Sequence, residues 1–131
     1  RMHAAQDVVI NDNILDAGQY QVTSTGGQRN CAFQQVSPKD IFEACWLPYQ
    51  MHGNVFIGSS GGWPKGNRSV RNAQSIGISA SPNKENELSD FKPRVSSEPG
   101  TDGKPIGADI DAIQTVLAGR DLSATTGPGK N

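Results

Sequence analysis

The chain has 131 residues, the size of one ordinary domain, and only 34% of them are hydrophobic. Its 15 glycines and 8 prolines favour short elements joined by many turns and argue against a bundle of long helices. The net charge is −1, from 12 basic and 13 acidic residues. We expect no nucleic-acid partner and no membrane partner, because the chain lacks both a strong basic excess and a long apolar run.

Four segments carry the signals of short strands. Residues 7–15 alternate β-branched and polar positions, which predicts two strands separated by a turn at 11–13. We expect a brief strand at 20–22, the clearest strand at 52–57, and another at 75–78. Glycine and asparagine lie beside most of these segments, so each strand should be short.

Two other segments predict helices. Residues 37–50 open with Ser37 and Pro38, which suit a helix cap and a first helical position, and Pro48 should end the helix. An irregular loop is the open alternative for this segment. Residues 106–119 form the better helix, because one apolar stripe recurs at helical spacing through Ile106, Ile110, Ile113 and Leu117.

The remaining segments complete the expected organisation of the chain. Residues 79–103 are poor in apolar side chains and should form an extended surface loop. We expect a leader at 1–6, strands and the long loop at 7–105, the helix at 106–119, and a disordered tail at 120–131.

Three motifs carry a family resemblance: GNVFIG at 53–58, GWPKGN at 62–67 and GTDGKPIGADIDAI at 100–113. They resemble the C-terminal end of secreted right-handed parallel β-helix proteins of the pectate-lyase-like superfamily, and residues 7–15 look like an earlier coil. The resemblance implies an all-β fold, namely a few C-terminal coils closed by a short amphipathic helix at 106–119. Since each coil buries its faces on its neighbours, the chain should be a C-terminal piece of a longer protein.

The resemblance also implies a function. We expect the C-terminal portion of an extracellular or periplasmic protein associated with polysaccharide, with a structural role and a carbohydrate-binding role. Self-association through open coil ends is a further expectation, because unpaired strand edges attract one another. Two alternatives remain open: a polysaccharide lyase or glycoside hydrolase, and a self-assembling structural protein. We do not expect this segment to carry the catalytic residues.

Large aromatic residues are the candidates for sugar binding. Trp63 lies in a glycine-rich loop, and Trp46 and Tyr49 follow the first predicted helix. Exposed rings of this kind stack on sugar faces, and their polar edges bind hydroxyl groups. The competing interpretation, which we favour for Trp63, is that the ring packs on the end of the solenoid or on the helix at 106–117.

Carboxylates supply the candidates for catalysis and for a metal. If the protein is an enzyme, the acid and base would come from Asp12, Asp16, Asp40 or Glu43, although no catalytic motif of the family matches them. The alternative for each is an ordinary solvated charge. Calcium is the cofactor that would suit Asp102, Asp109 and Asp111. We favour structural roles there, with Asp102 in an Asx turn and Asp109 as a helix cap, and expect no cofactor.

The two cysteines, Cys31 and Cys45, leave a choice open. In a secreted protein they would form a disulfide that closes a short loop and adds about 3 kcal/mol to the free energy of unfolding. Two free, buried thiols are the alternative.

Overall fold

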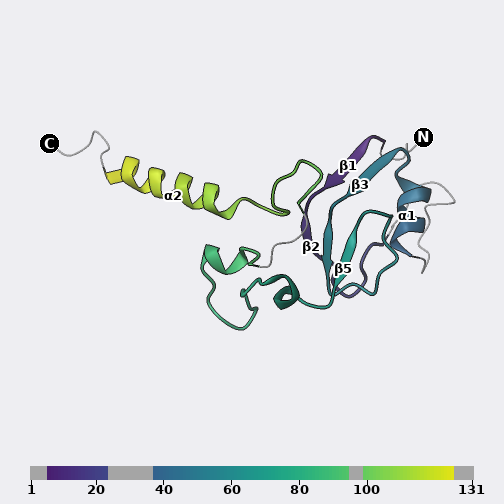
Figure 1. Ribbon diagram of the computed structural model, residues 1–131, viewed down its shortest axis with the longest axis horizontal. Helices are drawn as coiled ribbons and strands as arrows, with labels where there is room; N and C mark the ends of the chain where they lie inside the picture. Colours follow the sequence, from purple (N-terminus) through teal and green to yellow (C-terminus); the bar gives the residue numbers. More distant parts are fainter. Residues whose placement is uncertain (1–5, 24–36, 95–98, 126–131) are drawn as a thin grey trace.

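The computed structural model describes residues 6–23, 37–94 and 99–125. In this part of the chain the strands form two small parallel sheets (Figure 1). One sheet has two strands and the order β1-β3, and the other has three strands and the order β2-β4-β5. The strands are β1 (Val8–Asn11), β2 (Ile14–Asp16), β3 (Tyr49–His52), β4 (Val55–Ile57) and β5 (Arg68–Val70).

The first two strands confirm the interpretation of residues 7–15. β1 and β2 are separated by Asp12 and Asn13, and Asp12 adopts a left-handed conformation, with φ +61°, that short polar residues tolerate. The predicted strand at 52–57, in contrast, is split. Gly53 has a φ of +70°, so β3 ends at His52 and β4 begins only at Val55.

Three asparagines form a ladder beside these turns. The amide of Asn54 accepts hydrogen bonds from the backbone N–H (2.9 Å) and the side chain (3.1 Å) of Asn13. Its Nδ2 donates to the carbonyl oxygen of Ile10 (2.6 Å) and to Oδ1 of Asn67 (2.8 Å). Asn54 is only 1% exposed, and no buried side-chain nitrogen or oxygen in the described residues lacks a partner. The ladder therefore ties three turns together through a fully satisfied polar network.

The hydrophobic core lies on both faces of β4. Val55 packs in a cluster with Ile76, Ile78 and Ile106. Its neighbour Phe56 packs in a second cluster, with Phe42 and Met51. Successive side chains of a strand point to opposite faces, so this central strand of three residues contributes to both clusters.

Helix α1 (Pro38–Cys45) confirms the helical interpretation of the segment that begins at Ser37. The Ser37 hydroxyl accepts a hydrogen bond from the backbone N–H of Asp40 (3.3 Å), and Pro38 lies at the start of the helix. The helix buries Ile41, Phe42 and Cys45 on one face. The loop alternative for this segment is wrong.

Helix α2 (Ile110–Thr125) differs from the expected helix at both ends. It begins after Ile106, which is buried in the Val55 cluster, and it continues past Gly119 into the segment where we expected a disordered tail. The helix points away from the sheets, at the opposite end of the molecule from α1 (Figure 1). Ile113 and Leu117 are 39% and 48% exposed, so α2 does not close the core with the apolar stripe.

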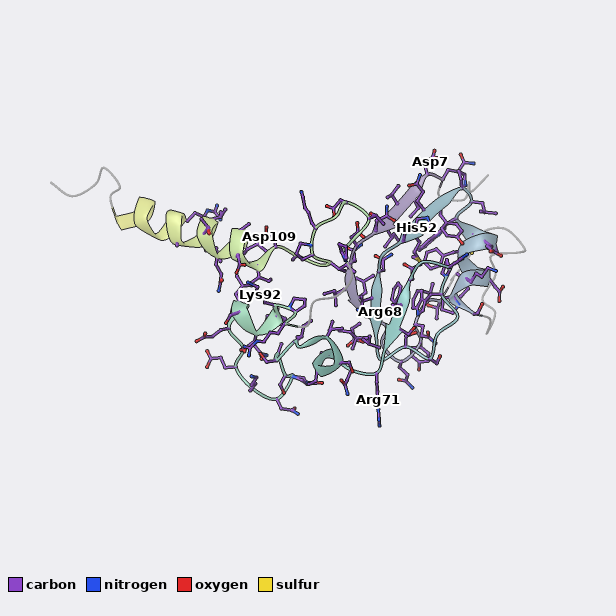
Figure 2. All side chains as sticks on the ribbon, viewed as in Figure 1. Asp7, His52, Arg68, Arg71, Lys92 and Asp109 are labelled. Atoms are coloured by element: carbon purple, nitrogen blue, oxygen red, sulfur yellow. The ribbon has the colours of Figure 1, made fainter. Side chains whose placement is uncertain are left out.

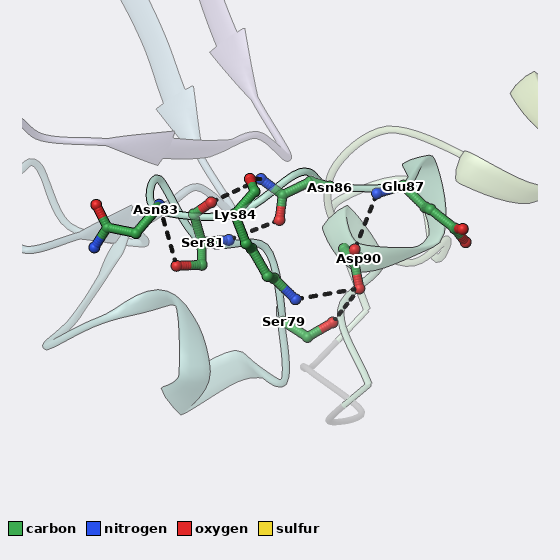
Figure 3. A network of polar contacts seen from close by, with 7 residues as sticks. All are labelled: Ser79, Ser81, Asn83, Lys84, Asn86, Glu87 and Asp90. Carbon is green, nitrogen blue, oxygen red and sulfur yellow. Dashed lines mark hydrogen bonds and ion pairs between the residues drawn. The ribbon is translucent and has the colours of Figure 1, made fainter.

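The long loop after β5 is held by Ile76 and Ile78, which enter the core, and beyond them by polar contacts. It contains two short 3₁₀ helices, η2 (Ala73–Ile76) and η3 (Leu88–Phe91), so the predicted strand at 75–78 is wrong. Figure 3 shows how Asp90 joins the two halves of the loop: its carboxylate accepts from the Ser79 hydroxyl (2.9 Å) and from the backbone N–H of Glu87 (3.0 Å). Both hydrogen bonds lower the pKa of Asp90 below its ordinary value of 3.8.

The expected right-handed parallel β-helix is wrong. The described residues form short strands in two small sheets together with two α-helices, which is a mixed α/β arrangement and not a series of coils. The predicted strand at 20–22 is also absent, since these residues form a turn and a bend. Residues 1–5 of the expected leader and residues 126–131 of the expected tail lie outside the described residues. In the described part of the chain, no helix is long and apolar enough to cross a membrane.

Candidate aromatic binding surface

The three aromatic residues that we predicted to bind sugar lie around one buried ring, that of Phe42. The ring centroids of Trp46, Tyr49 and Trp63 lie 4.6, 5.6 and 6.4 Å from the centroid of Phe42. Trp46, Tyr49 and Trp63 are all half-buried, whereas Phe42 is 2% exposed. Each of the three therefore packs on the core with one part and faces solvent with another. We call these three residues the aromatic surface.

Trp63 packs more closely than the other two. Its ring is stacked on that of Phe56, with a centroid distance of 3.5 Å and an interplanar angle of 3°. The packing that we favoured for Trp63 is thus present, but its partners are Phe56 and Phe42, not α2. Because Phe56 covers one face of the indole, only the opposite face and the ring edge of Trp63 are left for contact with a ligand.

The loop that carries Trp63 is fixed to the start of α1. The backbone N–H of Lys39 donates to the carbonyl oxygen of Gly62 (2.8 Å). A Cβ at Gly62 would lie 3.1 Å from both Pro38 and Ser37, so the backbone of the loop approaches the helix closely there. The indole Nε1 donates to the Ser59 hydroxyl (2.5 Å), which holds the ring in one orientation. The surface is therefore preorganised.

Two opposite charges lie beside Tyr49. Lys39 and Glu43 are one helical turn apart on α1 and form an exposed ion pair of 3.6 Å. Burial raises the pKa of the Tyr49 hydroxyl, Glu43 raises it further, and Lys39 acts in the opposite direction. The charges next to the aromatic surface therefore compensate each other.

The four catalytic candidates all have local partners. Asp12 accepts hydrogen bonds from Thr101, and Asp16 accepts one from the backbone N–H of Gly18 (2.7 Å). Asp40 accepts one from the Ser37 hydroxyl (2.7 Å), and Glu43 is paired with Lys39. No hydrogen bond between described residues joins any of these carboxylates to another. The enzymatic alternative stays a prediction that this arrangement does not favour.

The three metal candidates line one groove of about 780 Å³ beside the start of α2. Asp102 accepts from the backbone N–H of Lys104 (3.0 Å), and Asp109 accepts from that of Ala112 (2.9 Å), which are the Asx turn and the helix cap that we expected. Asp111 is paired with Lys92, which lies beside the first turn of α2 (Figure 2).

The charges of this groove do not favour a calcium ion. Lys92, Arg94 and Lys104 line it together with the aspartates, so cations oppose the carboxylates. Among the described residues, no group of three or more His, Cys, Asp or Glu side chains is placed to hold a metal. Asp102 and Asp109 thus make the structural contacts that we favoured, and calcium binding stays an untested alternative.

Asp12 fixes the turn between β1 and β2 to the segment before α2. Its Oδ1 accepts from the backbone N–H of Thr101 (2.7 Å) and its Oδ2 accepts from the Thr101 hydroxyl (2.5 Å). These hydrogen bonds, the hydroxyl first, hold the pKa of Asp12 below its ordinary value of 3.8. The charged carboxylate accepts these hydrogen bonds best, so ionised Asp12 stabilises the fold more than its neutral form does.

We therefore expect a pH-dependent contribution of Asp12 to stability. A carboxyl with a lowered folded-state pKa stabilises the protein above its unfolded pKa, near 3.8, and loses this contribution as the pH falls through the lower, folded value. Asp12→Asn should lower Tm at pH 5 to 7, and the difference from wild type should shrink below pH 3.8. Thermal unfolding followed by circular dichroism at several pH values measures this difference; a difference that is constant from pH 7 to below 3.8 would contradict the role of Asp12.

Sequence reasoning missed the residues that organise the aromatic surface. Phe42 and Phe56 carry no local sign that they support three other rings, since α1 and β4 meet only in the folded chain. Gln21 was also missed, although its side chain contacts Ser59 and Ser60, which are 38 and 39 positions away. The aromatic side chains themselves were the only signal that could have located the surface.

Comparisons of the chain with protein-family models, with curated proteins and with solved structures found no match. The resemblance to the pectate-lyase-like superfamily therefore stays a prediction. Cys45 is disulfide-bonded, which agrees with the first of the two alternatives for the cysteines. Cys31 lies outside the described residues.

Proposed function

We propose that this protein is a carbohydrate-binding domain without catalytic activity, from an extracellular or periplasmic protein that contacts polysaccharide. The observation that carries the proposal is the convergence of Trp46, Tyr49 and Trp63 on Phe42, with each of the three still partly exposed. Rigid rings lose little conformational entropy on binding, and they present apolar faces beside polar edges, as a sugar requires. The disulfide of Cys45 supports an oxidising compartment.

The two tryptophans of the chain make the proposal easy to test. Both belong to the aromatic surface, so a sugar that binds there should change the intrinsic fluorescence of the protein. Trp46→Leu keeps an apolar contact with Phe42 but removes the indole. We expect this variant to bind soluble polysaccharide at least about tenfold more weakly, by isothermal titration calorimetry, because central aromatic contacts dominate such sites.

Phe91→Ala is the matched control. Phe91 is also an exposed aromatic residue, 48% accessible, but it lies on η3 in the long loop and outside the aromatic surface. The affinity of Phe91→Ala for the polysaccharide should equal that of wild type. If both variants bind equally well, or if wild type binds none of the polysaccharides tested, the proposal is wrong.

Self-association is a second candidate function, and the projection of α2 favours it. On this helix Ile113, Val116 and Leu117 are 39%, 63% and 48% exposed. An isolated helix of this length is marginally stable in water, so a partner that covers these side chains would stabilise it. The surface differs from the open coil ends that we expected from the sequence.

Sedimentation over a concentration series tests self-association. We expect the mass of wild type to rise with concentration, and the double variant Val116→Lys/Leu117→Lys to remain monomeric, because charged side chains would remove the apolar contact. Gln114→Lys adds a charge to the same helix without removing an apolar group, and it should behave as wild type. A wild-type mass that stays monomeric throughout the series would exclude this function.

A further inference from the structure

A rim of neutral polar side chains borders the aromatic surface at Trp63. The Ser59 hydroxyl accepts hydrogen bonds from Nε1 of Trp63 (2.5 Å) and from the backbone N–H of Gly61 (3.0 Å), and it donates to Oε1 of Gln21 (2.8 Å). Nε2 of Gln21 donates to the Ser60 hydroxyl (2.8 Å). We call Gln21, Ser59 and Ser60 the polar rim.

The rim has hydrogen-bonding capacity left for a ligand. Ser59 already donates once and accepts twice, so it is saturated. Gln21 uses one of its two N–H donors and one of the two lone pairs of its carbonyl oxygen. Ser60 accepts from Gln21 and keeps its own proton, and this hydrogen bond is exposed to solvent. No other described residue forms a hydrogen bond with these polar groups, so within the part of the chain that the structure describes one amide and one hydroxyl remain able both to donate and to accept.

The backbone of Gln21 is also unusual. Its φ is +56°, a left-handed conformation that is uncommon for any residue other than glycine, asparagine or aspartate. Such a conformation persists only where the surrounding contacts hold it. Here the amide bridges two consecutive serines of the loop that carries Trp63, so the side chain has a defined position beside the indole.

The charges near the aromatic surface argue against an acidic ligand. All three side chains of the rim are neutral. The charges that act on Tyr49, those of Lys39 and Glu43, are paired with each other at 3.6 Å. A carboxylate on the ligand would therefore find no uncompensated cation in the polar rim or in the Lys39–Glu43 pair, whereas a neutral hydroxyl needs none.

From this geometry we propose that the aromatic surface binds a neutral polysaccharide and that Gln21 recognises its hydroxyl groups by hydrogen bonding. The inference rests on the proposed function and adds the class of ligand. The indole of Trp63 stacks on a sugar ring, while the free N–H and lone pair of Gln21 bind the hydroxyls at its edge. An amide suits a hydroxyl because each of them both donates and accepts.

Four hexasaccharides are suitable probes: the neutral cellohexaose, xylohexaose and mannohexaose, and the acidic hexagalacturonate. Binding to the full chain is followed by tryptophan fluorescence and by titration calorimetry. At least one neutral probe should bind, and hexagalacturonate should bind at least about tenfold more weakly than that probe. Gln21→Glu should weaken the neutral complex by about tenfold, because it replaces the amide donor by a charge.

Gln19→Glu is the matched control. Gln19 is exposed, lies two positions from Gln21 and receives the same change of charge, so this variant should retain the affinity of wild type. Ser60→Ala is a second test that leaves Gln21 in place, and it should weaken the complex by removing the one hydroxyl of the rim that is left for a ligand. Thermal unfolding of each variant identifies any loss of folded protein.

The outcomes separate this inference from the proposed function. If a sugar binds to wild type and Trp46→Leu lowers the affinity, the proposed function stands. The inference is nevertheless overturned if hexagalacturonate binds best, or if folded Gln21→Glu and Ser60→Ala bind like Gln19→Glu. If none of the four probes binds, both the inference and the proposed function fail.

Discussion

Replacing Asn54 with alanine is expected to lower the free energy of unfolding by about 3 kcal/mol, because the change removes the four hydrogen bonds of a side chain that is 1% exposed. The side chain of Asn54 satisfies the backbone N–H of Asn13, the carbonyl oxygen of Ile10 and Oδ1 of Asn67. Asn54 is 1% exposed, so water cannot replace these contacts unless the turns open. The loss is a large share of the roughly 5–15 kcal/mol that stabilises an ordinary domain.

Chemical denaturation and thermal unfolding measure this loss. For a domain of this size, about 3 kcal/mol corresponds to a decrease in Tm of roughly 10–15 °C. Asn83→Ala is the control, because Asn83 is exposed and its side chain makes no hydrogen bond with the described residues. That change should stay within about 0.5 kcal/mol of wild type. Equal stabilities of the two variants would mean that the ladder does not hold the turns together.

Replacing Gly53 with alanine should be the second strongly destabilising change, at about 3 kcal/mol, because strain in the backbone and a steric clash act together. Gly53 has a φ of +70°, which disfavours any side chain. An added Cβ would also lie only 2.1 Å from Oδ1 of Asp12, a distance that forces the carboxylate to move. The same oxygen accepts from the backbone N–H of Thr101, so the contact between the β1–β2 turn and the segment before α2 should break.

Gly58→Ala separates the two causes. Gly58 has nearly the same φ, +71°, but nothing lies within 4 Å of the position of its Cβ. Alanine there should cost only the backbone strain, about 1–2 kcal/mol. In an Asp12→Gly background, the cost of Gly53→Ala should fall to that of Gly58→Ala, because the clash has been removed. A cost of Gly53→Ala that is the same with and without Asp12 would show that backbone strain alone is responsible.

The pattern of residues predicted the local elements well where a local rule governs them. Ser37 and Pro38 start α1, Asp109 caps α2, and Asp102 forms its Asx turn, because a side chain and a backbone group a few positions apart suffice for each. The predicted strand at 52–57 shows the limit of such rules. Its apolar residues are strand residues, but the left-handed Gly53 interrupts them, and the glycine alone does not reveal its φ.

The fold class was predicted wrongly for a related reason. Short motifs such as GWPKGN indicate turns, and a turn does not determine how many strands stack beside it. The apolar stripe from Ile106 to Leu117 has a helical period. This period predicts a helix but does not indicate which surface the stripe packs against. In the structure Ile106 precedes the helix and enters the core, while Leu117 is 48% exposed on the projecting α2.

The sequence by itself determined the helix start at Ser37, the turn at Asp12 and the three rings of the aromatic surface, because these depend on residue type and near neighbours. Only the tertiary structure decided that β1 pairs with β3, that Asn54 joins Asn13 to Asn67, and that Gln21 borders Trp63. These contacts join groups that are 13 to 41 positions apart. They form only when packing of the core brings distant segments together, and the free energy of that packing belongs to the whole chain and not to any one segment.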